Sequence, residues 1–320
     1  MNILFITCSR IGDAVLTTGI LKFIEHAFPG AKVTIAVDPL PAPLFKDYPL
    51  LDRLIVFPKK KHSRHWVDLW MQTVARKWDW VIDCRGSVVS YGLWAKKRSL
   101  WHSTPGDTRH KVEQISGMAG IPTTSTHLWF SACRQEKAKA LLPDDHPYLA
   151  MAPAANWIGK QWPIEFFTDL AGQFITTYPS AKIAIFAAPH EQAMVQPLLN
   201  QLPSHACVDF IKNPLDLADV AACIQRCRVF IGNDSGLMHI AAAVKTPTIG
   251  LFGPSREENY GPWQSPNEDL HRVVRIPLSY EQLAQTPGFS HKCQTCFMTS
   301  LTTEKVWLSL RDRWDFSTLS

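Results

Sequence analysis

The sequence lacks any long hydrophobic run, and no stretch approaches the roughly 20 consecutive apolar residues of a membrane-spanning helix. The first residues, MNILFITCSR, place a short apolar run too early for a secretory signal. A strong excess of one charge is also missing, since 33 Lys and Arg stand against 28 Asp and Glu. A nucleic-acid-binding protein usually has a stronger basic bias. We therefore expect a cytoplasmic protein with no nucleic-acid partner.

Several sequence signatures of cofactor and metal chemistry are absent. Neither G-x-G-x-x-G nor G-x-x-x-x-G-K-[ST] occurs, which argues against dehydrogenases and P-loop nucleotidases. No Asp-x-Asp pair occurs that could hold a divalent metal on a diphosphate. We therefore expect no cofactor and no metal site. Cys293-x-x-Cys296 has the spacing of half a zinc site, but no second pair follows, and a structural loop is the preferred interpretation.

The length of 320 residues and a hydrophobic content of 46% fit two ordinary globular domains. Short apolar runs alternate with helical periodicities along the chain. Such alternation predicts parallel sheets covered by helices on both faces. The expected fold is therefore α/β, with two doubly wound, Rossmann-like domains that face each other across a cleft. Ligands of such sheets bind beyond the carboxyl ends of the strands.

The expected elements follow the hydrophobic pattern. We expect strands at 3–8, 33–37, 53–57, 80–84, 148–152, 182–187, 207–211, 228–232 and 246–252, and helices at about 15–28, 64–76, 164–177, 190–202, 215–226, 235–244 and 303–313. The pattern blurs at 99–145, and the segment Pro143–Pro147 is the expected linker. The predicted domains are 1–145 and 146–300, and the helix in 301–320 is expected to pack back toward the N-terminal domain.

The strongest local signal is Gly232-Asn-Asp-Ser-Gly-Leu-Met-His239, a strand that runs through a tight turn into a helix. The free N–H groups and the dipole of a helix N-terminus suit a diphosphate, and Gly236 permits close approach because it has no Cβ. Asp234 would repel phosphate, so it is expected to cap the helix or to bind sugar hydroxyls. The alternative is that Asp234 or Ser235 is only an N-cap and His239 an ordinary helix residue.

Ser235 and His239 also allow a hydrolase interpretation, with a nucleophile and its base four residues apart on one helix. No G-x-S-x-G elbow is present and no orienting acid can be identified, so this interpretation ranks below phosphate binding.

Three further candidates follow predicted strands. Lys160 lies in a Trp- and Gly-containing loop and would face the same edge as Ser235, although a solvated surface lysine is the alternative. Glu191 could bind ribose hydroxyls or simply favour the first turn of its helix. Asp13 follows the first strand, where an ionised carboxylate could take a proton from an attacking hydroxyl. On spacing alone, Asp13 could equally be a plain N-cap.

Five blocks together resemble the ADP-heptose:lipopolysaccharide heptosyltransferases, glycosyltransferase family 9. They are Ser9-Arg-Ile-Gly-Asp13, Asp83-x-Arg-Gly86, Lys160-x-Trp-Pro163, Asp234-Ser-Gly-Leu-x-His239 and Gly253-Pro-Ser255, and they run in the family's order over most of the chain. The resemblance implies a GT-B fold, with the donor in the C-terminal domain and the acceptor in the N-terminal domain.

The resemblance also implies roles for individual residues. Asp13 falls on the general base and Lys160 on the lysine that holds the donor phosphates. The remaining donor residues are Glu191, Asp234, Ser235, Gly236, Leu237 and His239. The acceptor side would comprise Arg10, Lys59, Lys60, Lys61, Arg64, Arg85 and His110. A solvated loop is the alternative for the run of lysines.

The partners that the resemblance implies are an ADP-heptose donor and a lipopolysaccharide acceptor, the Kdo- or heptose-bearing core on lipid A. The expected reaction is inverting and metal-independent, at the cytoplasmic face of the inner membrane, with peripheral contact to that membrane. Two alternatives keep the fold. One is a transferase for another nucleotide sugar and another surface glycan, and the other is a non-catalytic nucleotide-binding protein.

Overall fold

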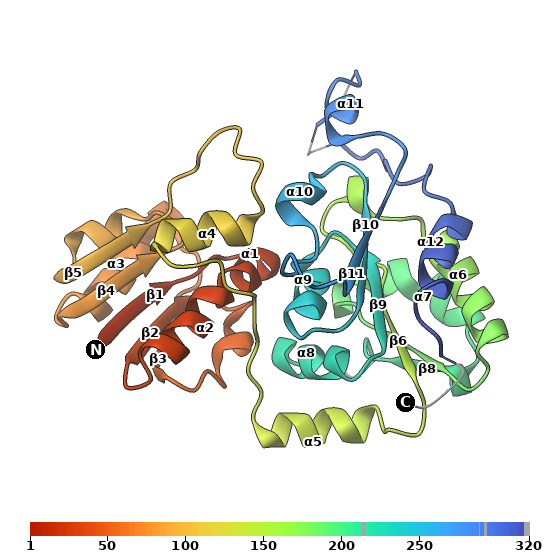
Figure 1. The fold of residues 1–320 in the computed structure, drawn as a ribbon, viewed down its shortest axis with the longest axis horizontal. Helices are drawn as coiled ribbons and strands as arrows, with labels where there is room; N and C mark the ends of the chain where they lie inside the picture. Colours follow the sequence, from red (N-terminus) through yellow and green to blue (C-terminus); the bar gives the residue numbers. More distant parts are fainter. Residues whose placement is uncertain (213–214, 288, 291–292, 317–320) are drawn as a thin grey trace. The chain divides into compact units, whose positions relative to one another are not determined.

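The structure is a computed structural model that describes residues 1–212, 215–287, 289–290 and 293–316. The chain divides into two units, Met1–Ser131 and Ala132–Ser320, each with its own parallel sheet (Figure 1). Among the residues described, no helix combines the length and apolar character that a membrane crossing requires.

The first unit is built on a five-stranded parallel sheet in the order β3-β2-β1-β4-β5. Its strands are β1 (Asn2–Ile6), β2 (Lys32–Val37), β3 (Leu51–Val56), β4 (Trp78–Asp83) and β5 (Ala95–Leu100). The central strand β1 is apolar on both faces because it is covered on both, and Ile3 pairs in register with Val33 on one side and Trp80 on the other.

Helices cover both faces of this sheet. They are α1 (Ile11–Leu16), α2 (Thr18–Ala27), α3 (Arg64–Thr73) and α4 (Lys111–Ala119), with 3-10 turns η1 (Ala42–Phe45), η2 (Lys61–Ser63) and η3 (Val88–Gly92). Leu69 of α3 and Val89 of η3 pack on Leu4, Ile6 and Val81. Helices α2 and α4 contact each other on the opposite face (Figure 1).

The turn after β4 is fixed by a fully buried carboxylate. Asp83 accepts hydrogen bonds from the backbone N–H groups of Arg85 (2.9 Å) and Ser87 (2.8 Å) and from the hydroxyl groups of Ser87 (2.5 Å) and Ser90 (2.7 Å). Gly86 within this turn has a φ of 62°, and a Cβ there would lie 2.2 Å from the carbonyl oxygen of Trp101. Both the left-handed backbone and the close approach therefore require glycine.

Replacing Gly86 by Ala is expected to lower the free energy of unfolding by about 2–4 kcal/mol, because a side chain must fit against a backbone carbonyl in a left-handed conformation. Gly117 in α4 is the matched control. A Cβ at Gly117 meets nothing within 4 Å, so Gly117→Ala should stabilise the helix slightly. Denaturant unfolding measures both effects, and equal stability of G86A and wild type would contradict the expectation.

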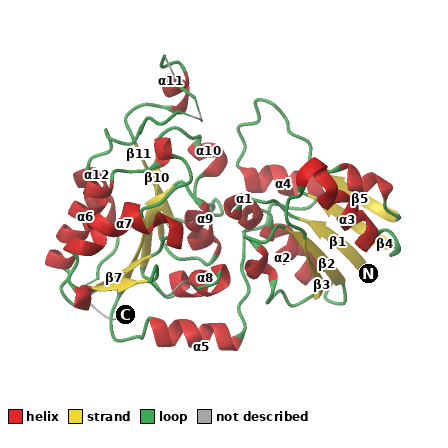
Figure 2. Cartoon of the chain, turned by 180° about the vertical axis from the view of Figure 1, so that it is seen from behind, coloured by secondary structure: helices red, strands yellow, loops and turns green. Residues whose placement is uncertain are grey.

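The second unit contains a six-stranded parallel sheet in the order β11-β10-β9-β6-β7-β8. Figure 2 shows this unit with its helices in red and its strands in yellow. The strands are β6 (Tyr148–Ala152), β7 (Lys182–Ile185), β8 (Cys207–Asp209), β9 (Val229–Asn233), β10 (Thr248–Phe252) and β11 (His271–Arg275). The helices are α5 (Ala132–Leu141), α6 (Ile164–Thr177), α7 (Gln192–Gln201), α8 (Leu217–Gln225), α9 (Gly236–Ala243), α10 (Glu257–Tyr260), α11 (Tyr280–Ala284) and α12 (Thr303–Arg311), with 3-10 turns η4 (Ile158–Lys160), η5 (Pro189–Glu191) and η6 (Ser204–Ala206).

The observed division of the chain differs from the expected boundary at 145/146, because α5 packs on α8 in the second unit. The guanidinium group of Arg134 bonds to the carboxylates of both Asp216 and Asp219. Helix α12 contacts α6 and β11, and its Val306 and Leu310 belong to the core of the second unit. These contacts place residues 132–145 and α12 with the second sheet, whereas 301–320 had been expected to pack toward the first domain.

Several elements were not predicted from the pattern. Strands β5 and β11 and helices α4 and α5 fall where the sequence is polar or irregular. The helix expected from Val15 is in fact two helices, α1 and α2, that meet at Thr17. Because α1 begins at Ile11, Asp13 lies in the first helical turn rather than in the preceding loop, and Arg10 is the N-cap.

His271, the first residue of β11, is 2% exposed, and neither ring nitrogen has a hydrogen-bond partner among the described residues. Burial, assisted by the charge of Lys245, lowers the pKa of His271 to about 4. In the unfolded chain the ring would titrate near its ordinary pKa of 6.5. Between these values the unfolded state binds the extra proton, so stability is lost as the pH falls from about 6.5 toward 4.

Replacing His271 by Leu should remove this acid sensitivity. From pH 7 to pH 5 the wild type is expected to lose about 2 kcal/mol more unfolding free energy than H271L, since one pKa unit corresponds to about 1.4 kcal/mol. His205 is exposed and serves as the control, because H205L should keep the wild-type slope. Urea titrations at several pH values measure this difference, and parallel pH profiles for H271L and wild type would rule the effect out.

Candidate active site

The donor-side candidates of the second unit gather at the carboxyl edge of its sheet. Lys160 follows β6, Asp234 and Ser235 follow β9, and Ser255 follows β10. Strands β6, β9 and β10 are neighbours in the sheet. The loops that carry these residues therefore follow neighbouring strands at one edge of the sheet.

Lys160 and Asp234 form an ion pair. The Lys160 ammonium lies 2.5 Å from Asp234 Oδ2, and the Asp234 side chain is only 6% exposed. A buried carboxylate needs such a partner, because an unpaired charge would be costly to desolvate. Lys160 and Asp234 are therefore one ion pair at this edge. From the sequence they were two separate candidates.

The loop that carries Lys160 is held by hydrogen bonds on both sides. Asn233 accepts from the backbone N–H of Trp162 (3.0 Å) and donates to the carbonyl of Pro153 (2.7 Å). The indole of Trp162 donates to the carbonyl of Leu301 (2.7 Å). Asn233 therefore fixes the β6 loop to β9 and positions Lys160, a role that the sequence reasoning missed although the residue lies inside the strongest motif.

The Cys293–Cys296 segment packs against the same loop. The indole of Trp157 donates to the carbonyl of Cys293 (2.9 Å), and the thiol of Cys296 donates to the carbonyl of Gln161 (3.2 Å). Within the part of the chain that the structure describes, no three His, Cys, Asp or Glu side chains group as metal ligands. These contacts fasten the segment to the β6 loop through the backbone of Cys293 and the thiol of Cys296.

Two serine hydroxyl groups at this edge are buried with no hydrogen-bond partner in the part of the chain that the structure describes. Ser235 is the N-cap of α9 but makes no side-chain capping bond, and the Oγ atoms of Ser235 and Ser255 have no hydrogen-bond partner among the described residues. The guanidinium of Arg275 donates to the carbonyls of Gly253 (2.9 Å) and Ser255 (3.4 Å). These hydrogen bonds hold the loop that follows β10. Two unsatisfied hydroxyls beside a helix N-terminus suit an anionic ligand.

The hydrolase interpretation fails on the same observation. Because Ser235 Oγ bonds to no described side chain, His239 is not hydrogen-bonded to it as a general base would be.

Of the remaining donor-side candidates, three lie on the expected helix, whereas Glu191 precedes its helix and ends the 3-10 turn η5. Gly236 is the first residue of α9, Leu237 is half-buried, and His239 is buried on the same helix. The carboxylate of Glu191 accepts from the backbone N–H of Ala188 (2.8 Å) and caps the short turn η5. This hydrogen bond uses one carboxylate oxygen of Glu191 and leaves the other outside the cap.

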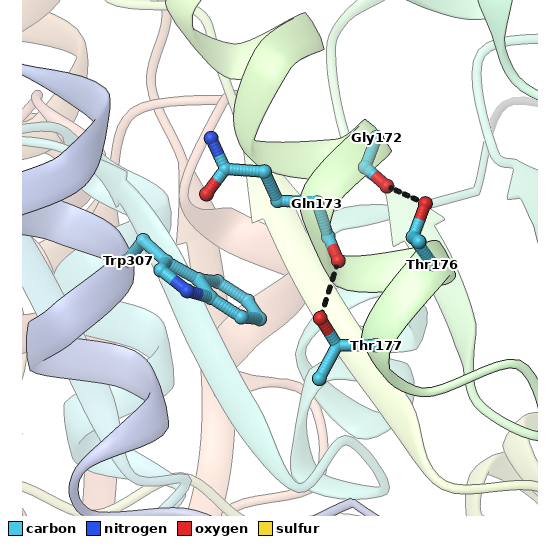
Figure 3. Close-up of a pocket in the computed structure, with 5 residues that line it drawn as sticks. All are labelled: Gly172, Gln173, Thr176, Thr177 and Trp307. Atoms are coloured by element: carbon cyan, nitrogen blue, oxygen red, sulfur yellow. Dashed lines mark hydrogen bonds between the residues drawn. The ribbon is translucent and has the colours of Figure 1, made fainter.

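A shallow groove of about 360 Å³ lies elsewhere in this unit, between α6 and α12 (Figure 3). The hydroxyls of Thr176 and Thr177 in it donate to the carbonyls of Gly172 and Gln173 of their own helix, at 2.8 and 2.9 Å. Trp307 completes the lining, and no lining residue is ionisable. The groove offers no chemistry for binding a diphosphate.

In the first unit, Asp13 is electrostatically coupled to Cys8 and Lys111. Burial lowers the pKa of Lys111, and the nearby Asp13 carboxylate is the largest influence opposing that shift. Burial and then the Asp13 charge raise the pKa of the Cys8 thiol to about 12, so Cys8 stays protonated. A lysine near Asp13 favours the ionised carboxylate.

Lys111 was missed in the sequence because it lies in the stretch where the pattern blurs. It is the first residue of α4, after the unpredicted strand β5, and its ammonium lies 3.4 Å from the centre of the Trp101 ring. The adjacent His110 caps α4, accepting from the backbone N–H of Val112 at 3.2 Å. A positive side chain directly after a helix cap is the signal that could have drawn attention to Lys111.

The other basic candidates of this unit differ in how firmly they are held. The Arg85 guanidinium lies 2.7 Å from the Asp38 carboxylate and 4.5 Å from the centre of the Trp66 ring. Lys60 pairs with Asp68 at 2.6 Å. Four other basic side chains are exposed and have no ion pair among the described residues: Arg10, Lys59, Lys61 and Arg64. Arg85 is thus held by an ion pair and a ring contact, whereas these four cations are exposed.

Comparison with solved structures defines the class of fold. The chain matches the E. coli ADP-heptose lipopolysaccharide heptosyltransferase II over 98% of both chains, with a TM-score of 0.75 and 18% identity. The two parallel sheets are those of the GT-B fold, with two Rossmann-like domains, which confirms the expected fold class.

Sequence comparison then gives the family. Residues 106–275 match the model of glycosyltransferase family 9 (heptosyltransferase), and the chain belongs to this family of glycosyltransferases. It is 24% identical to lipooligosaccharide heptosyltransferase 2 of Campylobacter jejuni over 92% of this chain and 94% of that one. It is 29% identical to lipooligosaccharide heptosyltransferase 2 of Haemophilus influenzae, over 53% of this chain and about half (49%) of that one.

Proposed function

We propose that the protein is an inverting, metal-independent heptosyltransferase that moves heptose from ADP-heptose to a Kdo or heptose residue of the lipopolysaccharide inner core. Family membership supports the transfer chemistry, and relatives named as lipooligosaccharide or lipopolysaccharide heptosyltransferases support the substrates. The observation that carries the proposal is a pair of buried hydroxyls, Ser235 and Ser255, that have no hydrogen-bond partner among the described residues. They lie on the loops after β9 and β10, and the neighbouring strand β6 leads to Lys160.

The donor diphosphate would occupy this edge of the second unit. The Ser235 and Ser255 hydroxyls and the N–H groups from Gly236 onward would donate to its oxygens. Lys160 would neutralise the charge that develops on the leaving group, which is the reason for proposing metal independence. Asp234, held in place by Lys160, would accept hydrogen bonds from sugar hydroxyls.

The nucleoside and the remaining donor contacts would involve three residues. Glu191 has a carboxylate oxygen beyond the one that caps η5, and it would accept from ribose hydroxyls. Leu237 and His239 would line the donor side of α9.

Asp13 would act as the general base. The acceptor hydroxyl oxygen attacks the anomeric carbon as Asp13 takes its proton, the bond from that carbon to the diphosphate oxygen breaks, and ADP leaves with the electron pair. The coupled Lys111 would keep Asp13 ionised before the transfer. This step requires Asp13 and the donor edge to meet across one cleft, which is part of the proposal.

The acceptor is anionic, and the basic residues of the first unit would bind its phosphate and carboxylate groups. They are Arg10, Lys59, Lys60, Lys61, Arg64, Arg85 and His110. Because that acceptor is anchored by lipid A, we further propose that the enzyme works in the cytoplasm with peripheral contact to the inner face of the inner membrane.

The proposal is tested by incubating the purified protein with ADP-heptose and defined Kdo- and heptose-bearing core acceptors. We expect mass spectrometry to show a heptosylated acceptor and one ADP released for each heptose transferred. A metal chelator should leave the rate of transfer unchanged. ADP-, GDP- and UDP-hexoses serve as donor controls. Transfer only from another nucleotide sugar would overturn the donor assignment, and loss of activity with the chelator would overturn metal independence.

A further inference from the structure

Six large apolar side chains are exposed on two adjacent elements of the first unit. They form what we call the apolar patch: Val67, Trp70 and Met71 on α3, and Val88, Tyr91 and Trp94 on or just after η3. Helix α3 contacts η3, and the Trp70 indole donates to the carbonyl of Gly92 at 3.1 Å. Tyr91 is 62% exposed, Trp94 71% and Val88 84%.

The exposure follows from how the chain crosses from β4 to β5. A single 3-10 turn, η3, stands where a crossover helix would cover the sheet, and only Val89 and Ser90 of this turn are buried, followed by Leu93 just after it. The Arg98 guanidinium bonds to the carbonyls of Ser90 (3.0 Å) and Leu93 and holds the turn. The outward side chains are thus presented on a fixed backbone and contribute little to the core.

The charge around the patch is strongly positive. Residues 59–98 contain ten Lys and Arg and three Asp, a net charge of +7, whereas the other 280 residues contain 23 Lys and Arg and 25 Asp and Glu, a net charge of −2. All three aspartates are engaged: Asp68 with Lys60, Asp79 with Lys96, and Asp83 within its turn. Two of the arginines, Arg76 and Arg85, pair with Asp52 and Asp38 outside the segment, which reduces the excess from +7 to +5. The side chains of Lys59, Lys61 and Arg64 have no ion pair among the described residues.

We propose that the apolar patch and the basic residues beside it dock the protein on an anionic phospholipid surface. Trp and Tyr place an apolar ring and a polar tip at the boundary between headgroups and acyl chains, and Lys and Arg bind the anionic headgroups. A second copy of this chain would meet the same excess of positive charge and be repelled. The inference rests on the proposed function, since it explains how an enzyme with a lipid-anchored acceptor reaches it.

The test uses full-length protein and phosphatidylcholine vesicles with or without phosphatidylglycerol. We expect sedimentation with the anionic vesicles only, weakened by salt, and at least about tenfold weaker partitioning for the variant V88S/Y91S/W94S. The control L308S changes an exposed leucine on α12 and should bind vesicles like wild type. Thermal melting checks that both variants fold.

A second readout separates this inference from the proposed function. The patch variant should keep wild-type heptose transfer to a water-soluble, delipidated core acceptor and lose transfer to acceptor embedded in anionic vesicles. The docking surface would be overturned if the variant bound anionic vesicles as well as the wild type does, or if the wild type bound neutral vesicles as well as anionic ones. Either result would leave the proposed transferase function intact. Dissociation of a dimer by the substitutions, without vesicle binding by the wild type, would assign the patch to self-association and also overturn the inference.

Discussion

Replacing Asp13 by Asn is expected to lower kcat for heptose transfer by about 10²–10⁴-fold, because the amide cannot take the proton of the acceptor hydroxyl. The substitution preserves the shape of the side chain and its place in the first turn of α1. Affinity for ADP should stay at the wild-type value, since the proposed diphosphate site belongs to the other unit. Steady-state transfer assays and calorimetric titration with ADP measure the two quantities separately.

Asp52 provides the matched control, because D52N makes the same chemical change on β3, where the carboxylate pairs with Arg76 at 2.5 Å. D52N should leave kcat unchanged. Transfer by D13N at a rate within a few-fold of wild type would refute the role of Asp13 as base, and a parallel loss of ADP binding would point to misfolding instead.

Replacing Lys160 by Met is expected to lower kcat/KM by about 10²–10³-fold, the usual effect of removing one stabilising donor from a developing charge. The effect has a second component, because Asp234 would lose its partner and confront the donor diphosphate as an unpaired carboxylate. Unlike D13N, this variant should also bind ADP more weakly. The two variants therefore separate a catalytic base from a phosphate-binding cation.

Three further variants sharpen this expectation. Lys182 begins β7 at the opposite, amino edge of the sheet, so K182M should behave as wild type. K160R keeps the charge and should restore part of the activity. K160M/D234N removes both charges and should recover the thermal stability that K160M loses, but not transfer. Recovery of wild-type transfer by the double variant would show that Lys160 serves only to neutralise Asp234.

The parts of the fold that could be predicted are those where burial imposes a clear period on the sequence. Strand β6 and helix α6 lie at the residues expected from the pattern, because one is buried throughout and the other has a continuous apolar face. Strand β5 was missed since it is an edge strand whose Lys96, Lys97 and Arg98 are exposed. Helix α5 was missed because Ala138 is its only buried residue and ion pairs secure it instead.

The candidate site shows a similar division. Motif spacing predicted the elements of Lys160, Asp234 and Ser235, because carboxyl ends of neighbouring parallel strands meet at one edge. The ion pair between Lys160 and Asp234 could not be predicted, since loop conformation decides it. Lys111 could not be identified from the sequence either. Its proximity to Asp13 depends on helix α4, which follows the unpredicted strand β5. The roles assigned to these residues remain predictions.

The most direct test of the account is the anomeric configuration of the product, determined by NMR after the wild-type enzyme has transferred heptose to a defined core acceptor. A single displacement, with Asp13 taking the proton of the attacking hydroxyl and Lys160 beside the departing diphosphate, predicts a glycosidic bond of configuration opposite to that of the donor. Retention of the donor configuration would contradict the account.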